Sequence, residues 1–157
     1  MNSFTLDEIY VGQKESVTKT ITKGDIYVFS GLVDDYSPVH VNKEFGEKSQ
    51  FGKCIAHGFI SASLFSTLAG NYLPGAGSLY VRQSLNFLLP VYEGDTITAT
   101  FEVIQKGEDV VKPDGTVKFS AGRIVMRATA VNQKGELVVE GEACSMAARE
   151  KVDCSPY

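Results

Sequence analysis

Acidic residues are missing from the middle of this sequence. No aspartate or glutamate lies between Lys48 and Tyr92, and the most apolar segment of the chain, residues 58–70, falls inside that gap. A helix formed by this segment therefore has no carboxylate of its own to take part in a reaction. Asp34 and Asp35 are the carboxylates that most closely precede His40 in the sequence.

The sequence also lacks the features of secreted, membrane and nucleic-acid-binding proteins. Its N-terminus has no positive region followed by an apolar core, so we expect no signal peptide. Residues 58–70 are too few to span a membrane. A formal charge of −4 without a long basic run argues against nucleic acid or an anionic membrane as partner. The three widely spaced cysteines form neither a disulfide framework nor a zinc motif, which favours a cytoplasmic protein.

The length and composition predict one domain. With 157 residues, 43% of them hydrophobic, the chain has enough apolar material for one core. We expect a single domain over residues 1–149. Residues 150–157 show no periodicity, and we expect a flexible C-terminal tail.

The first third of the chain predicts a strand followed by helices. Alternation within residues 11–21 favours an edge strand with one polar face. Thr22 and Asp25 have the spacing of a capping box at a helix start, and Pro38 ends that helix because the residue before a proline avoids helical geometry. Residues 42–50 predict a short helix or a surface loop.

The remainder predicts one enclosed helix and a β-sheet. Residues 58–70 place apolar side chains around the whole helix, so we expect the helix to be buried on all sides. Strands are expected over residues 78–89, 96–104, 116–131 and 136–147, and a surface hairpin over 107–115. The fold class is α+β, a hotdog arrangement in which a long antiparallel sheet wraps around a central helix. Such a sheet leaves open edges, so we expect a homodimer.

The candidate chemistry lies around the two histidines. Asp35 ends the first helix, and His40 is expected in an extended segment just past Pro38, so that the two side chains converge. A carboxylate and an imidazole that share one water molecule can orient it and take its proton. The alternative is that Asp35 is a surface acid and His40 a turn residue.

Gly58 begins the apolar helix directly after His57. A free N–H group at a helix start can polarise a carbonyl. The alternative is that the glycine serves packing. We expect the His57 side chain to be structural. Ser66 either points toward a pocket or bonds a carbonyl one turn back. The spacing of the histidines does not match a catalytic zinc site, so no metal is expected.

Residues 29–42, which contain Asp35-Tyr36-Ser37-Pro38-Val39-His40, resemble the hydratase-2 motif of the MaoC-like (R)-specific enoyl-CoA hydratases. The resemblance covers about residues 11–147 and extends to further segments, at 57–66, 73–80 and 83–91. Ser37 stands where the motif usually has asparagine. Asn42 stands where an aspartate often follows the histidine.

The resemblance implies a homodimeric hotdog enzyme that adds water to a trans-2-enoyl-CoA, giving an (R)-3-hydroxyacyl-CoA, without metal or organic cofactor. By the same resemblance Asp35 and His40 activate the water, and the N–H of Gly58 polarises the thioester. Ser37, His57 and Ser66 are assigned to substrate binding.

Three questions stay open at this point. The substrate carrier is either coenzyme A or an acyl-carrier protein. A hotdog thioesterase and a non-catalytic acyl-thioester binding module are the alternative functions, and the missing carboxylate on the apolar helix argues against the thioesterase. The candidate cations for the carrier phosphates are Lys43, Lys48, Lys53 and Arg82.

Overall fold

The computed structural model describes residues 1–157 except 108–109, 112, 114–116, 119–121 and 157. Its helical elements are η1 (Leu6–Glu8), α1 (Lys23–Val33), α2 (Pro38–Val41), α3 (Lys43–Lys48) and α4 (Gly58–Asn71). Its strands are β1 (Lys14–Thr20), β2 (Leu79–Phe87), β3 (Thr96–Lys106), β4 (Val110–Val111), β5 (Val117–Lys118), β6 (Arg123–Val131) and β7 (Leu137–Met146).

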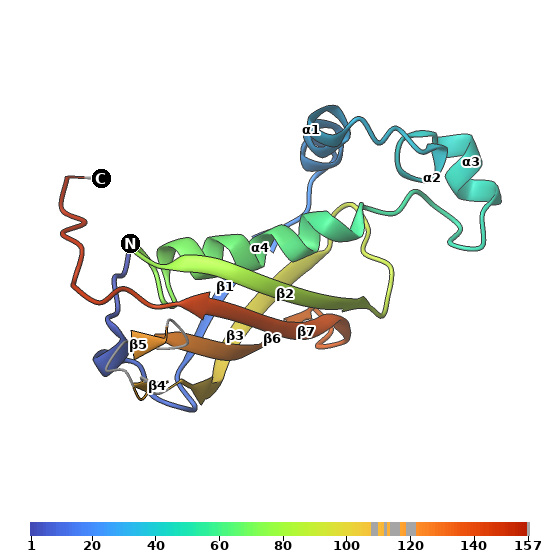
Figure 1. The fold of residues 1–157 in the computed structure, drawn as a ribbon. Helices are drawn as coiled ribbons and strands as arrows, with labels where there is room; N and C mark the ends of the chain where they lie inside the picture. Colours follow the sequence, from blue (N-terminus) through green and yellow to red (C-terminus); the bar gives the residue numbers. More distant parts are fainter. Residues whose placement is uncertain (108–109, 112, 114–116, 119–121, 157) are drawn as a thin grey trace.

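Five strands form one antiparallel sheet in the order β1-β3-β6-β7-β2, with α4 lying across one face (Figure 1). This is the predicted hotdog arrangement. Strand β2 does not pair with β3, the next strand in the chain. It pairs with β7 at the far edge of the sheet.

The region between β3 and β6 differs from its prediction in part. β4 and β5 pair as a small antiparallel ribbon, whose second strand lies beyond the hairpin predicted over residues 107–115. The single strand expected over residues 116–131 is described as β5 and β6. Part of the predicted hairpin and part of this strand lie outside the described residues.

The core lies between α4 and the inner face of the sheet. β3 alternates strictly, so that Ile97, Ala99, Phe101 and Val103 are buried while their neighbours face outward. Phe65 of α4 stacks on Phe101 with ring centroids 5.4 Å apart.

One face of α4 stays uncovered, which corrects the prediction that this helix is buried on all sides. Phe59 is 60% exposed, and Ser63, Ser66 and Gly70 continue the exposed stripe at helical spacing. The apolar strand β2 beside it is also largely exposed, with Leu79 at 63%. The apolar composition of these two elements therefore exceeds what one copy of the chain buries.

Helices α1, α2 and α3 lie together beyond the N-terminal end of α4 (Figure 1). Pro38 is the first residue of α2, a position where its missing N–H costs nothing. His40 therefore sits in a helical turn, and the extended conformation predicted for it is wrong. The predicted short helix within residues 42–50 is α3, capped by the side chain of Asn42.

The N-terminus of α1 is held by the predicted capping box. Asp25 Oδ2 accepts hydrogen bonds from Thr22 N at 2.8 Å and Thr22 Oγ1 at 2.7 Å, and Lys19 Nζ lies 3.0 Å from Asp25 Oδ1. The hydrogen bonds from Thr22, aided by Lys19, lower the pKa of Asp25 from 3.8 to about 2.

We expect Asp25→Ala to lower the free energy of unfolding at pH 7 by about 1 kcal/mol, because the capping bonds are lost. A lowered pKa in the folded state means that this stabilisation is present above the unfolded-state pKa and is lost as pH falls through the folded-state value. The difference between variant and wild type should therefore shrink between about pH 4 and pH 2. Urea titrations across that range measure it, and a difference independent of pH would contradict the prediction.

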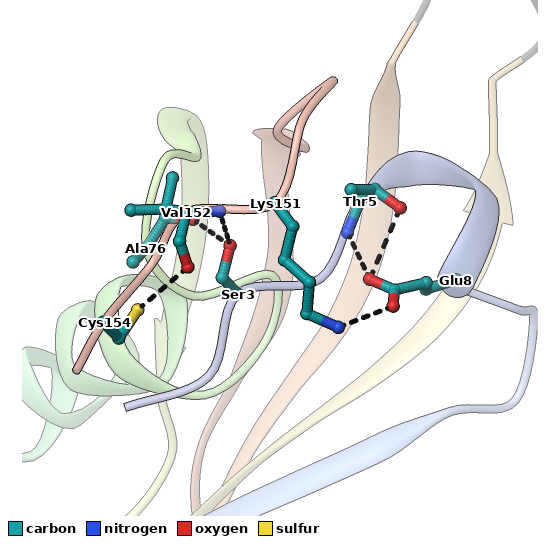
Figure 2. A network of polar contacts seen from close by, with 7 residues as sticks. All are labelled: Ser3, Thr5, Glu8, Ala76, Lys151, Val152 and Cys154. Carbon is teal, nitrogen blue, oxygen red and sulfur yellow. Dashed lines mark hydrogen bonds and ion pairs between the residues drawn. The ribbon is translucent and has the colours of Figure 1, made fainter.

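The C-terminal segment contacts the N-terminal segment (Figure 2). Val152 N donates to Ser3 Oγ at 3.0 Å, and Lys151 Nζ lies 2.7 Å from Glu8 Oε1. Val152 Cγ2 also lies 2.6 Å from where a Cβ on Gly77 would be placed. These contacts attach the first part of the tail, whose flexibility over residues 150–157 stays a prediction.

All three cysteines are free. The longest helix, α4, has 14 residues, and none of the helices in the described part of the chain has the length and hydropathy that a membrane crossing requires.

Candidate active site

Asp35 lies directly after α1, where Asp34 takes a left-handed conformation and turns the chain. The carboxylate of Asp35 is half exposed, and its Oδ1 accepts a hydrogen bond from the backbone N–H of Ser37 at 3.1 Å. This bond is an Asx turn, which fixes the carboxylate relative to Pro38 and the start of α2. Ser37 thus supports Asp35 through its backbone N–H.

The two histidine rings stack on one another with centroids 3.8 Å apart and an interplanar angle of 27°. His40 is partly exposed, and its Nδ1 lies 2.8 Å from the carbonyl oxygen of Ile55. His57 lies beneath it, 3% exposed, and also packs against the ring of Phe29. The partly exposed ring of His40 therefore rests on a buried aromatic support.

His57 also connects this stack to Asp35. Its Nε2 lies 3.0 Å from the backbone oxygen of Asp35 and 3.7 Å from Asp35 Oδ2. One ligand atom from each of Asp35, His40 and His57 lies within 4.8 Å of the others. The structure therefore brings together the carboxylate and both imidazoles, which the sequence places up to 22 residues apart.

The cluster has atom types that can bind a metal, and its hydrogen bonds occupy one nitrogen of each imidazole ring. Both Nδ1 of His40 and Nε2 of His57 already donate to carbonyl oxygens, which cannot themselves donate. Those two nitrogens carry protons and are not free to bind a cation.

The same bonds predict one tautomer for each neutral ring. His40 carries its proton on Nδ1, leaving Nε2 as a free base, whereas His57 carries it on Nε2. Nδ1 of His57 is buried without a hydrogen-bond partner among the described residues. Long-range ¹H–¹⁵N correlation at about pH 8, above the ordinary histidine pKa, should show these two tautomers. A proton on Nε2 of neutral His40 would contradict the geometry.

Gly58 begins α4 beside an apolar cavity of about 370 Å³. The cavity is walled by His40, Gly58, Ser61 and a set of apolar residues, namely Phe51, Ile55, Ala56, Phe59, Phe87, Leu88, Leu89, Pro90, Val91 and Val139. A Cβ atom at position 58 would lie 2.8 Å from two ring carbons of Phe87, so the backbone here is approachable only because the residue is glycine. Within the described chain nothing accepts a hydrogen bond from the N–H of Gly58.

Ser66 is the one candidate residue that this protomer does not bring to the others. It lies two helical turns past Gly58 on the exposed stripe of α4, and among the described residues it does not line either cavity beside His40. The sequence alone did not indicate Ile55 and Phe87, because a backbone carbonyl and an apolar strand residue carry no recognisable pattern.

The arrangement suits proton transfer next to an apolar substrate. His40 and Gly58 both line the apolar cavity, and the carboxylate of Asp35 lies within 4.8 Å of a ring nitrogen of His40. Such a set can activate water and stabilise an oxyanion.

Comparison with known proteins gives the following similarities. Residues 8–132 match the family model described as "MaoC like domain". The chain is 40% identical over 140 residues to an (R)-specific enoyl-CoA hydratase of Rhodospirillum rubrum, covering 89% of each chain. It is 41% identical over 130 residues to the (R)-specific enoyl-CoA hydratase of Aeromonas caviae, covering 83% of this chain and 93% of that protein.

A solved structure is similar as well. The unliganded R-hydratase PhaJ1 of Pseudomonas aeruginosa superimposes with a TM-score of 0.84 at 34% identity, covering 96% of this chain and 89% of that one.

Proposed function

The chain belongs to the MaoC-like domain family, and from this membership we propose that it is an (R)-specific enoyl-CoA hydratase. It adds water to trans-2-enoyl thioesters to give (R)-3-hydroxyacyl thioesters and catalyses the reverse dehydration. The observation that carries the proposal is the cluster of Asp35 with His40, because His40 lines the same apolar cavity as Gly58.

In the proposed reaction Asp35 and His40 hold one water molecule between them. One of the two bases takes a proton from the water as its oxygen bonds to C3 of the enoyl group, and a proton is delivered to C2. The oxygen and the proton add to the same face. His40 Nε2 is the free base for this step, because its Nδ1–H is bonded to the carbonyl of Ile55.

The backbone N–H of Gly58 polarises the thioester in the proposed reaction. It donates to the thioester oxygen, which draws electrons from C3 and stabilises the enolate that forms when water adds. The positive end of the α4 dipole acts in the same direction. The apolar cavity holds the uncharged part of the substrate beside the thioester.

Crotonyl-CoA tests the proposal. We expect loss of enoyl absorbance on adding the protein, with (R)-3-hydroxybutyryl-CoA as product by chiral analysis. Release of free thiol without loss of the double bond would instead identify a thioesterase. Inactivity toward enoyl-CoA substrates of every chain length, with binding retained, would identify a binding module.

We further propose a homodimer formed through β2 and the exposed stripe of α4. Of the two sheet edges, β1 is mostly polar, whereas β2 exposes Leu79, Val81 and Phe87. An exposed apolar edge strand beside an exposed helix face is suited to pairing with a second copy.

This proposal predicts that Val81→Lys produces monomer, because the dimer would have to bury the charged group in its interface. Sedimentation velocity at micromolar concentration measures it, with Val17→Lys on the opposite edge as control. Wild-type protein sedimenting as a monomer would contradict the prediction.

A further inference from the structure

A second cavity, of about 500 Å³, shares His40 with the apolar one and has otherwise different lining residues. Unlike the apolar cavity, this one is lined by charged residues, namely three lysines and two glutamates. The lining residues are Lys23, Ile26, Tyr27, His40, Val41, Lys43, Glu47, Gly52, Lys53, Cys54, Glu93 and Gly94. His40 belongs to both cavities, so a substrate that reacts at His40 has access to each.

Two of the three lysines are held by aromatic rings and not by carboxylates. Lys53 Nζ lies 4.1 Å from the ring centroid of Tyr92, and Lys23 Nζ lies 5.7 Å from that of Tyr27. Neither ammonium group has a carboxylate oxygen within 4.0 Å in the described part of the chain. A cation–π contact positions an ammonium group and leaves N–H donors for another acceptor.

The remaining charges at the cavity are balanced differently. Lys43 Nζ lies 3.7 Å from Glu47 Oε1 on the next turn of α3, so its charge is already compensated. Glu93 lines the cavity too and favours a cation over an anion at its own position. The two ammonium groups without carboxylate partners, Lys23 and Lys53, are therefore the groups able to bind an anion.

We propose, resting on the proposed function, that Lys23 and Lys53 bind an anionic group of the thioester substrate. The group is either a phosphate of the carrier or a carboxylate on the acyl chain. Both present oxygen atoms that accept charge-assisted hydrogen bonds from ammonium groups. A thioester held at His40 then extends one end into the apolar cavity and the other toward Lys23 and Lys53.

The structure shows which of the cations predicted to bind the carrier phosphates line this cavity. Lys48 Nζ is paired with Glu44 at 2.6 Å, and Arg82 is paired with Glu142 at 3.7 Å. Neither lines the cavity, whereas Lys23, which no sequence pattern marked, does. Lys23 and Lys53 belong to different segments, α1 and the loop before α4, and only the fold places both at one cavity.

The double variant Lys23→Gln/Lys53→Gln tests the proposal, because glutamine keeps a long polar side chain and removes the charge. The control is Lys14→Gln/Lys134→Gln, which removes the same charge at two exposed residues that do not line the cavity. The substrates are crotonyl-CoA, uncharged crotonyl-pantetheine, and an enoyl-pantetheine with a carboxylate at the end of its acyl chain. Binding of inorganic pyrophosphate and of glutarate is measured by calorimetry, so that one readout does not depend on turnover.

If the anion is a carrier phosphate, the cavity variant raises KM for crotonyl-CoA by about tenfold or more with kcat changed less than about twofold. KM for crotonyl-pantetheine then stays unchanged. If the anion is an acyl carboxylate, KM rises for the carboxylated substrate and not for crotonyl-CoA. In either case the variant loses affinity for the corresponding small anion, pyrophosphate or glutarate, and the control does not.

Equal KM values in the cavity variant and the control for every substrate would overturn the proposal. The proposal would also be overturned if KM for uncharged crotonyl-pantetheine rose as much as KM for the charged substrates. If no substrate is hydrated, the proposed function has failed, and the calorimetry alone then tests whether Lys23 and Lys53 bind an anion. Unchanged affinity of the cavity variant for both anions would then overturn the anion site.

Discussion

Replacing Asp35 by asparagine, or His40 by glutamine, is expected to lower the turnover of crotonyl-CoA by about 10²- to 10⁴-fold, the range for loss of a general acid or base. Each variant keeps a polar side chain of similar size, so the loss should appear in kcat more than in KM. The Asx turn also survives in Asp35→Asn, because the amide oxygen can still accept from the N–H of Ser37.

Asp34→Asn is the matched control for this pair. Asp34 is the adjacent carboxylate, exposed and in the left-handed conformation that asparagine also adopts readily. The turnover of the Asp34→Asn variant should stay within about twofold of wild type, because exposed substitutions that remove no contact have small effects. The double variant Asp35→Asn/His40→Gln should be little worse than either single variant, since residues that act as a unit are not additive. Near-wild-type turnover in either single variant would show that the assignment is wrong.

Gly58→Ala is expected to lower kcat/KM on the order of a hundredfold, the size of effect seen when an oxyanion donor is lost. The new methyl group would stand 2.8 Å from the ring of Phe87 and beside the N–H to which the thioester oxygen must come close. The nearest atoms that the new methyl group meets all belong to the Phe87 side chain and none to the backbone, so the fold should survive with a small change in melting temperature.

A second substitution separates the clash of the methyl group with Phe87 from its covering of the backbone N–H at position 58. Phe87→Ala in the Gly58→Ala background removes the clash but leaves the methyl group over the N–H. We expect stability to return and activity to stay low, relative to Phe87→Ala alone. Gly24→Ala in α1 is the control, because a Cβ there meets only Thr22 Oγ1 at 3.6 Å. Full recovery of kcat/KM in the double variant would mean that Gly58 serves packing.

The local elements of this fold follow from short-range patterns. The capping box of Thr22 and Asp25 begins α1, and strict alternation marks β3. Each depends on residues within a few positions of one another, and for that reason the sequence predicts it. The conformation of His40 was predicted wrongly because a proline disfavours helix only for the residue before it and is itself a favourable helix start.

The pairing of strands is not local. Both β2 and β3 have strand composition, but composition does not say that β2 crosses to the far edge to pair with β7. The exposure of β2 and of one face of α4 follows from that edge position. An apolar helix is predicted to be enclosed, yet its enclosure requires more surface than this one chain provides.

The sequence by itself determined which groups were available for chemistry. With no acidic residue on α4, the candidates for a carboxylate partner of His40 were Asp34 and Asp35, which closely precede it. Tertiary structure decided how they are held. His57 stacks under His40 and bonds the backbone of Asp35, 22 residues away, and the carbonyl of Ile55, 15 residues from His40, sets its tautomer.

Tertiary structure likewise placed Lys23 and Lys53 at one cavity and left Ser66 on the exposed face of α4. The physical reason is the range of the interactions. Hydrogen bonds within a turn depend on neighbouring residues, whereas ring stacking and cavity walls depend on the packing of the whole chain.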